Sequence, residues 1–168
     1  MKIWIDADAA PNDVKTIVAK AALRLEVETA LVANQRLQTP ANNPFVSSVR
    51  VEGGPDVADD HIAEHAEPGD LAITADIPLA ARLVEKDVST IDPRGTEYTR
   101  ANIGERLSVR DFMDELRSTG VETGGPQAWN PQNKQAFAST FDRVLTKLMR
   151  AAQKKAAKKG PTDPSFGP

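Results

Sequence analysis

The sequence has 168 residues, of which 40% are hydrophobic and 27% charged, and its net charge is −3. These values suit one globular domain with a proper core. The absence of cysteine excludes disulfides, thiolate nucleophiles and cysteine-ligated zinc. No apolar run approaches ~20 residues, so we predict that nothing spans a membrane, and the acidic residues near the start argue against a secretory signal. We therefore expect a cytoplasmic protein.

Strand and helix signals alternate through the first half of the chain. Five short apolar runs predict strands at residues 3–5, 27–33, 45–51, 70–74 and 88–91. Apolar residues at helical spacing predict helices after Pro11, over residues 56–66 and after Pro78. This alternation is typical of parallel βαβ units. We therefore predict an α/β fold, a three-layer sandwich around a mostly parallel central sheet of about five strands.

The second half of the chain is predicted to be helical. A polar connector over residues 96–104 should precede two helices with apolar stripes, at Val109–Leu116 and Phe137–Leu148. Beyond these helices, Ala/Lys repeats and a Pro/Gly-rich end carry no such stripe. We predict a single domain over residues 1–149 and a basic tail, frayed or disordered, over residues 150–168.

Charge is distributed unevenly along the chain. Seven acids and no lysine or arginine occur between Glu52 and Asp70, whereas seven bases and no acid occur between Arg143 and Lys159. This asymmetry fits a protein that binds a polyanion and holds cations at an acidic centre. The alternative is that the acidic segment is an ordinary surface and the basic segment a solvated helix, which would contain the same numbers of acidic and basic residues.

Aspartates stand where two of the predicted strands end. Asp6 and Asp8 follow the first strand, and Asp76 follows the fourth. Ligands of α/β folds bind beyond the carboxyl ends of the strands, so Asp6 and Asp76 should meet if these strands are neighbours. The alternative is that Asp6 and Asp8 only cap the next helix.

Two further aspartates are expected near this edge. Asp56 and Asp59 lie in the first turns of the helix that leads into the fourth strand. Carboxylates that converge in a partly dry cleft need protons or cations, and oxygen ligands select Mg²⁺ or Mn²⁺. We predict such a metal site, formed by Asp6, Asp8, Asp56, Asp59 and Asp76. His61 and His65 have no third ligand nearby and are predicted to be surface residues.

Two chemistries fit these residues. In the first, the catalytic residues Asp6, Asp8 and Asp76 hold a metal ion that activates water for the hydrolysis of a phosphodiester such as RNA. In the second, typical of haloacid-dehalogenase-type phosphatases, Asp6 is a nucleophile, Asp8 a general acid/base and Thr74 a phosphate ligand. Against the second, Ala10 stands where that motif has Thr or a Val-like residue. A non-catalytic module that binds a cation and a nucleic acid or protein partner is the third possibility.

Four side chains are candidates for binding substrate: Thr74, Arg94, Lys154 and Lys155. Arg94 follows the fifth strand. Its guanidinium group could donate paired hydrogen bonds to a phosphate, or it could form a salt bridge with Asp92 or Glu97. The two lysines could bind a nucleic-acid backbone without sequence preference. The sequence sets neither an oligomeric state nor a protein partner.

Five motifs, in order, resemble those of the YaiI/YqxD family of uncharacterised bacterial proteins. They are IDADAAP at residues 5–11, GPDVAD at 54–59, GDLAITADIPLA at 69–80, DPRG at 92–95 and TGGP at 123–126. The resemblance extends to about residue 148. That family is generally grouped with PIN-like domains, which are Mg²⁺- or Mn²⁺-dependent ribonucleases with a parallel sheet and an acidic cleft.

The resemblance implies a PIN-like fold and roles for three residues. Thr74 and Asp76 match the Thr-x-Asp-x-x-Leu-Ala stretch of PIN nucleases, and Asp6 resembles their first-strand aspartate. One departure stands out, because family members usually read Asp-Ala-Asp-x-Cys-Pro and this chain has Ala10 at the cysteine position. Any role of that thiol is absent here, whereas a carboxylate–metal site is unaffected.

Overall fold

The computed structural model describes residues 1–124 and 127–158. Its elements, in chain order, are β1 (Ile3–Asp6), α1 (Asn12–Leu25), β2 (Thr29–Ala33), β3 (Val46–Arg50), α2 (Pro55–His65), β4 (Leu71–Ile73), α3 (Ile77–Glu85), β5 (Ser89–Ile91), β6 (Glu97–Tyr98), α4 (Ile103–Ser118) and α5 (Pro131–Lys158). Within the described residues, no helix combines the length and the apolar character that a membrane crossing requires.

The strands of the described residues form one six-stranded sheet in the order β3-β2-β1-β4-β5-β6. β1 pairs in parallel with both β2 and β4, and the outer pairs β2–β3 and β4–β5 are also parallel. The predicted α/β fold with a mostly parallel sheet is confirmed. Because every parallel crossover returns the chain to the same side, the carboxyl ends of β1 to β5 share one edge of the sheet.

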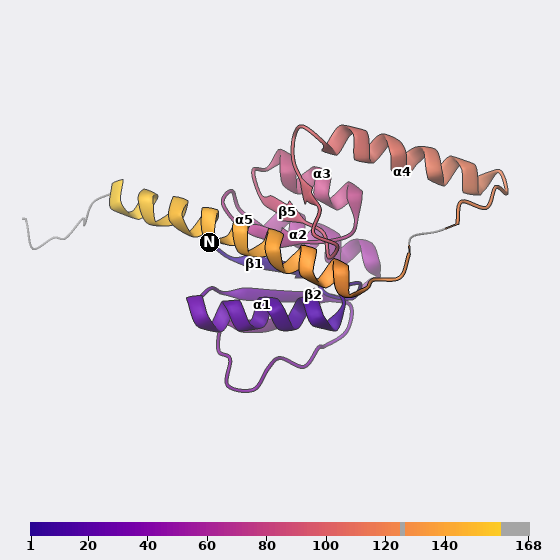
Figure 1. The fold of residues 1–168 in the computed structure, drawn as a ribbon. Coiled ribbons are helices and arrows are strands. Elements are labelled where there is room, and N and C mark those ends of the chain that lie inside the picture. The colour runs from indigo at the N-terminus through magenta and orange to yellow at the C-terminus, as the bar shows by residue number, and fades with distance from the viewer. Residues whose placement is uncertain (125–126, 159–168) are drawn as a thin grey trace, which may run out of the picture.

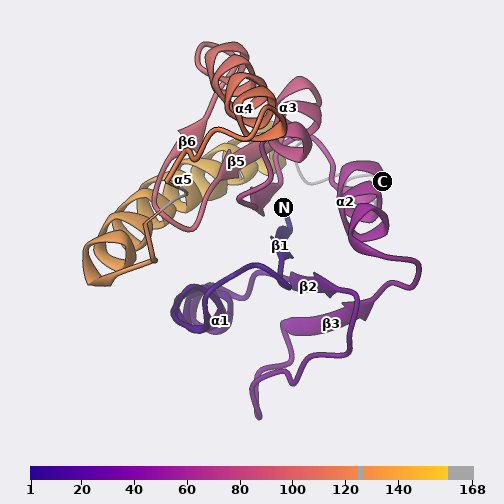
Figure 2. The same ribbon diagram turned by 90° about the vertical axis from the view of Figure 1, so that its right-hand side faces the viewer.

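Side chains of the central strands alternate between two cores, one on each face of the sheet. Ile3 and Ile5 point into the core formed with α1 and α5, whereas Trp4 points into the core formed with α2 and α3. Figure 1 and Figure 2 show the resulting layers, with α1 and α5 on one face and α2 and α3 on the other. The predicted three-layer sandwich is therefore confirmed.

A short sixth strand replaces part of the predicted polar connector. Glu97 and Tyr98 form β6, which pairs with β5 in the antiparallel direction. The prediction of a connector without a strand is wrong at these two residues, because two residues are too few to show an alternating pattern. Tyr98 is buried and packs in a small cluster with Ala80 and Val84 of α3.

α4 lies outside both cores. It packs against α3 and projects from the body of the protein (Figure 1). None of its residues is buried, and Val109 and Phe112 are 51% and 58% exposed. The apolar spacing of residues 109–116 therefore predicted the helix correctly, but most of this stripe stays in contact with solvent.

α5 continues beyond the predicted domain boundary at residue 149. Leu148 and Met149 are its last residues packed against the core, and residues 150–158 are exposed at the end that extends past the N-terminus in Figure 1. Instead of a frayed tail, residues 150–158 form helix, because alanine, lysine and glutamine favour helix without core contacts. The rest of the predicted tail, residues 159–168, lies outside the described residues.

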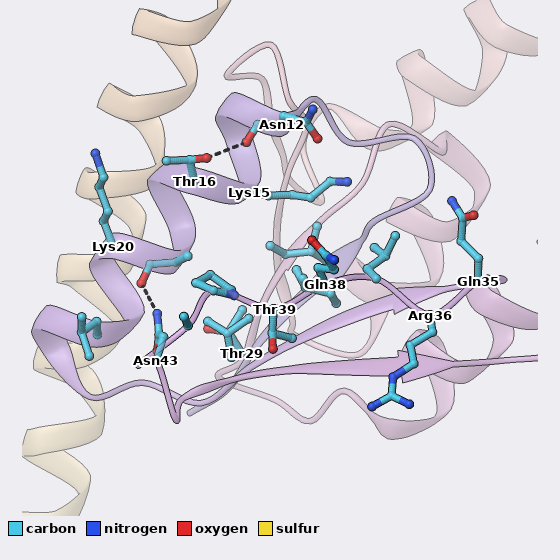
Figure 3. A pocket seen from close by; sticks show the side chains of 18 residues that line it. Asn12, Lys15, Thr16, Lys20, Thr29, Gln35, Arg36, Gln38, Thr39 and Asn43 are labelled. Carbon is cyan, nitrogen blue, oxygen red and sulfur yellow. Dashed lines mark hydrogen bonds between the residues drawn. The ribbon is translucent and has the colours of Figure 1, made fainter.

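A cavity of about 740 Å³ separates α1 from the loop between β2 and β3. Figure 3 shows its lining, which combines apolar side chains with polar residues of the loop such as Gln38 and Thr39. The loop is tied down at Asn43, whose Nδ2 donates to the backbone oxygen of Ala19 at 2.9 Å. None of the five predicted metal-binding aspartates lines this cavity.

Candidate functional site

The pairing of β1 with β4 brings Asp6 and Thr74 together. Ile5 lies opposite Ile73, so the next residue of each strand reaches the same level of the sheet. The Thr74 hydroxyl donates to Oδ2 of Asp6 at 2.9 Å and accepts a hydrogen bond from the backbone N–H of Asp76 at 3.0 Å. Thr74 is 2% exposed. A buried hydroxyl therefore connects the ends of the two strands and orients the Asp6 carboxylate.

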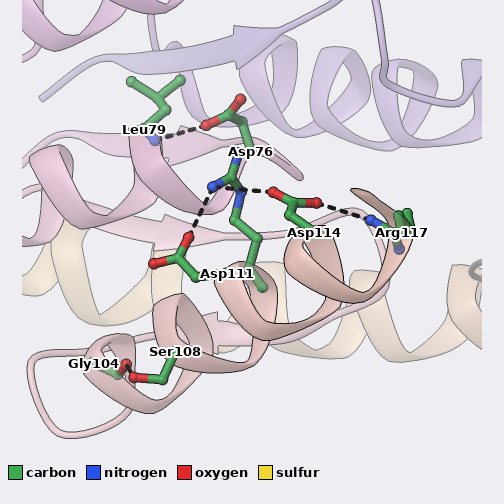
Figure 4. Close-up of polar contacts among 8 residues, drawn as sticks. Asp76, Leu79, Gly104, Ser108, Asp111, Asp114 and Arg117 are labelled. Carbon is green, nitrogen blue, oxygen red and sulfur yellow. Dashed lines mark hydrogen bonds and ion pairs between the residues drawn. The ribbon is translucent and has the colours of Figure 1, made fainter. Parts of the chain in front are cut away.

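Asp76 is the N-cap of α3. Its Oδ1 accepts a hydrogen bond from the backbone N–H of Leu79 at 2.8 Å, as Figure 4 shows. Pro78, in the first helical turn, supplies the preset backbone angle that favours a helix start. The strand–aspartate–proline–helix sequence thus fixes one carboxylate at the carboxyl end of β4.

Asp59 joins this pair from the first half of α2. Burial, followed by the negative charges of Asp76, Asp6 and Asp56, raises the pKa of Asp59 from 3.8 to about 7. A hydrogen bond between the Asp59 and Asp76 carboxyl groups acts in the same direction. Near neutral pH, this carboxyl group is therefore about half protonated, unlike an ordinary aspartate.

The pKa of Asp6 is also raised by burial and by neighbouring carboxylates. Burial raises the pKa of Asp6, the hydrogen bond from Thr74 opposes that rise, and the charges of Asp76 and Asp8 add to it. The charge of Asp76 therefore acts on both Asp6 and Asp59, in addition to the larger effect of burial. We call these three residues, from β1, α2 and the start of α3, the aspartate cluster.

Asp8 and Asp56 lie at the margin of the aspartate cluster. Both are exposed, and each is close enough for its charge to act on a member of the cluster. The Oδ2 atom of Asp8 accepts a hydrogen bond from the backbone N–H of Asn34 at 2.7 Å, which ties the β1 turn to the end of β2. All five predicted ligands therefore gather at the carboxyl edge of the sheet.

The donors present fit a hard divalent cation in their chemistry. They are carboxylate oxygens, and burial together with neighbouring carboxylates raises the pKa values of Asp6 and Asp59, so a cation there would favour their ionised forms. In addition, the buried Oδ1 of Asn34 has no hydrogen-bond partner among the described residues. Among those same residues, however, no three histidine or acidic side chains are already positioned around one ion. The side chains would have to close in on it.

His61 and His65 do not contribute to a three-residue group of this kind within the described residues. Their rings stack with centroids 4.1 Å apart, beside the ring of Trp4. His65 is exposed and His61 partly so, which matches the prediction that both are surface residues.

Thr74 and Arg94 differ in how free they are to bind substrate. The Thr74 hydroxyl is buried and already bonded to Asp6, so its proton is not available for a phosphate. The Arg94 guanidinium bonds to the backbone oxygen of Gln127 and, at 3.3 Å, to Oδ1 of Asn133. The alternative of a salt bridge from Arg94 to Asp92 or Glu97 is wrong, since neither pair is formed.

Lys154 and Lys155 lie away from the aspartate cluster. α5 is anchored near the carboxyl edge by Thr140, whose hydroxyl donates to the backbone oxygen of Gly95 at 2.8 Å. Gly95 makes that contact possible, because a Cβ there would come within 2.6 Å of the α5 backbone. Lys154 lies ~21 Å further along the helix axis, towards the opposite edge. The structure does not bring the two lysines to the cluster.

Three arginines of α4 were missed by the sequence analysis. Arg106, Arg110 and Arg117 line a groove of about 900 Å³ together with Arg94 and with Ala75 and Ile77, the neighbours of Asp76. Their spacing along the chain places them on one face of a helix, and this pattern is a signal that the sequence does contain. The sequence could not show that α4 would turn this face towards the segments that follow β4 and β5.

Comparison with known proteins gives a family but no experimental fold. Residues 4–147 match the family described as "Uncharacterized BCR, YaiI/YqxD family". A protein of Myxococcus xanthus named "UPF0178 protein" is 54% identical over 92% of this chain and 100% of its own length. Proteins of the same name are 56% identical in Citrifermentans bemidjiense, over 89% of this chain and 97% of theirs, and 49% identical in Dechloromonas aromatica, over 88% and 98%. No solved structure matches the chain.

Proposed function

The chain belongs to the YaiI/YqxD family, and we propose that it hydrolyses phosphodiester bonds, with RNA as the substrate and Mg²⁺ or Mn²⁺ as the cofactor. The observation that carries this proposal is the aspartate cluster at the carboxyl edge of a parallel sheet, with the pKa of Asp59 raised to about 7. A cluster that holds excess negative charge in a partly buried position is suited to a divalent cation. We place the protein in the cytoplasm, where RNA and Mg²⁺ occur together.

In this proposal, Asp6, Asp59 and Asp76 hold the cation, and Asp8 and Asp56 complete its surroundings. A divalent ion at this position supplies positive charge to the phosphate oxygens and promotes the ionisation of water. Thr74 keeps the Asp6 carboxylate turned towards the cluster through its 2.9 Å hydrogen bond. Asp76 is held by the start of α3 in the same way. The PIN-like character inferred from the sequence motifs agrees with this division of roles.

Two observations weigh against the phosphatase alternative. The Thr74 hydroxyl, which would bind phosphate in that mechanism, is buried and committed to Asp6. Moreover, the cluster contains more carboxylates than one nucleophile and one general acid require.

The experiment that tests the proposal incubates the purified protein with single-stranded RNA and, separately, with a generic phosphomonoester. Mg²⁺, Mn²⁺ and EDTA are compared, and Asp6→Asn is the inactive variant. We expect cleavage of RNA that requires the metal and that Asp6→Asn abolishes. Cleavage of the monoester alone, with an intermediate trapped on Asp6 by beryllium fluoride, would establish the phosphatase instead. Inactivity on both substrates would leave only a binding function.

A further inference from the structure

The groove beneath α4 borders the aspartate cluster. It has a volume of about 900 Å³, at the upper end of the range for sites that hold small molecules. Ala75 and Ile77 both line it, so Asp76 stands at its margin. The groove therefore lies between α4 and the segments that follow β4 and β5, next to Asp76, although no residue of the aspartate cluster lines it.

Arginine dominates the charge of this groove. Its lining contains four arginines and two acids, namely Arg94, Arg106, Arg110, Arg117, Asp92 and Glu105. Arg110 is paired with Asp111 at 3.1 Å and with Asp114 at 3.5 Å, and Arg117 is paired with Asp114 at 2.9 Å. Figure 4 shows these ion pairs along α4.

Two of the arginines have no carboxylate partner among the described residues. The Arg94 guanidinium bonds only to the neutral oxygens of Gln127 and Asn133, and Arg106 forms no ion pair within residues 1–124 and 127–158. Arg106 lines the same groove as Ala75 and Ile77, the two neighbours of Asp76 in the chain. The groove therefore carries positive charge next to the segment that holds Asp76.

The arginines of the groove form a row of positive charges along α4 rather than a single charged site. Arg106, Arg110 and Arg117 follow one face of α4, and Val109 and Met113 lie among them in the lining. Guanidinium groups bind phosphate through paired hydrogen bonds, and exposed apolar side chains offer contact to sugars and bases. A repeating polyanion can use such a row, whereas one phosphate group cannot.

We propose that this groove binds the phosphate backbone of a single-stranded RNA and leads the strand to the aspartate cluster. The proposal rests on the proposed function for its substrate class, but it concerns binding and is measured without turnover. It assigns Arg106 to direct contact with a phosphate. Arg94 contacts a second phosphate at the end of β5, and the two ion-paired arginines of α4 extend the row.

The test measures binding of a fluorescent single-stranded RNA to the full-length protein in EDTA, by anisotropy over a series of salt concentrations. Arg106→Ala should weaken binding about ten-fold at low salt, since it removes a hydrogen bond between charged groups. It should also reduce the log–log salt dependence by ~0.7, the contribution of one phosphate contact to a single strand. Arg106→Ala/Arg110→Ala should weaken binding further, and Arg106→Lys should retain part of it.

Arg24→Ala is the matched control. It removes the same charge from the last turn of α1, which lies at the opposite edge of the sheet because α1 begins beyond β1 and ends before β2. We expect wild-type affinity and salt dependence. If the groove variants bind RNA as Arg24→Ala does, the groove is not the binding surface. A loss confined to Lys154→Ala/Lys155→Ala would move the RNA to α5 and likewise overturn the proposal.

The results distinguish failure of the groove proposal from failure of the hydrolase proposal. Metal-dependent RNA cleavage by the wild type, combined with unchanged binding in the groove variants, rejects the groove and keeps the hydrolase. Weakened binding in the groove variants, combined with a wild type that cleaves nothing, keeps the groove and rejects the hydrolase. Thermal melts of Arg106→Ala and Arg24→Ala confirm that both are folded before their affinities are compared.

Discussion

The Thr74 hydroxyl donates a hydrogen bond of 2.9 Å to Asp6 across two neighbouring parallel strands. Residues 68 positions apart in the chain are joined by this bond at the edge where the aspartates gather. The same hydroxyl accepts the backbone N–H of Asp76. One buried side chain therefore orients the Asp6 carboxylate and holds the backbone at Asp76, whose own carboxylate is fixed by the Leu79 N–H.

Thr74→Val tests that relationship. Valine keeps the shape and the strand preference of threonine but leaves Asp6 without its donor, so the pKa of Asp6 should rise further and its affinity for Mn²⁺ should fall. We expect the unfolding free energy to decrease by about 1–2 kcal/mol. Calorimetric titration with Mn²⁺ and a thermal melt measure the two effects.

Thr90→Val is the control for Thr74→Val. Thr90 is 0% exposed on neighbouring β5, and its hydroxyl donates to the backbone oxygen of Val88 at 3.1 Å. The Thr90→Val variant should lose a similar amount of unfolding free energy and should keep the wild-type affinity for Mn²⁺. Equal Mn²⁺ affinity in Thr74→Val and Thr90→Val would mean that Thr74 does not position Asp6.

The raised pKa of Asp59 predicts how stability depends on pH when metal is removed. The folded protein keeps a proton on Asp59 up to about pH 7, whereas the unfolded chain releases it near pH 3.8. This contribution to stability is complete below that lower value and is lost as the pH rises through about 7. Asp6 acts in the same direction. In EDTA, the melting temperature should therefore fall between about pH 4 and about pH 7.

Asp59→Asn should remove most of this fall and raise the melting temperature at neutral pH. Asp60→Asn serves as the control, because Asp60 is exposed in the same helix and pairs with Arg82 at 2.8 Å. It should follow the wild-type curve. The same decline in Asp59→Asn as in the wild type would assign the pH dependence to other groups.

Asp70 provides a structural counterpart to the site aspartates. It is 7% exposed at the opposite edge of the sheet, and its carboxylate accepts hydrogen bonds from the Lys2 N–H, the Trp4 indole and the Glu67 N–H. Asp70→Ala should lower the unfolding free energy by about 3 kcal/mol, since the buried donors lose a charged acceptor. Its folded fraction should bind Mn²⁺ like the wild type. Weaker Mn²⁺ binding by folded Asp70→Ala would show that Mn²⁺ affinity does not depend on the aspartate cluster alone.

Removal of the exposed end of α5 tests whether the basic stretch contributes to the site. Leu148 and Met149 are the last core contacts of α5, so truncation after Arg150 should leave the melting temperature nearly unchanged. Any loss of RNA affinity should be independent of metal, and cleavage should continue at the wild-type maximal rate. A change in that rate would show that the far end of α5 reaches the cluster.

The sequence predicted the parts of the fold that depend on local patterns. Buried parallel strands give continuous apolar runs, and Asp6 and Asp76 follow two of them, so the carboxyl edge could be identified once β1 and β4 were taken as neighbours. β6 was missed because two residues show no period. The helical end of α5 was missed because helix preference alone, without an apolar stripe, extends it to Lys158.

The groove beside the cluster could not be predicted in the same way. Its arginines are visible in the sequence of α4, but their position beside the segments that follow β4 and β5 depends on how α4 packs on α3. Similarly, the sequence predicted either a phosphate contact or a salt bridge for Arg94. The salt bridge is not formed, and the guanidinium bonds to Asn133 of α5, 39 positions away in the chain, a contact that no local pattern encodes.

The aspartate cluster should bind a divalent cation, and calorimetric titration of the metal-free protein with Mn²⁺ tests this binding most directly. The wild type and Asp60→Asn should bind Mn²⁺ and, at a concentration 100 times Kd, gain about 2.7 kcal/mol of stability. Asp6→Asn and Asp76→Asn should lose that binding, although asparagine preserves the cap of α3. Mn²⁺ binding of wild-type strength in both Asp6→Asn and Asp76→Asn would contradict the account.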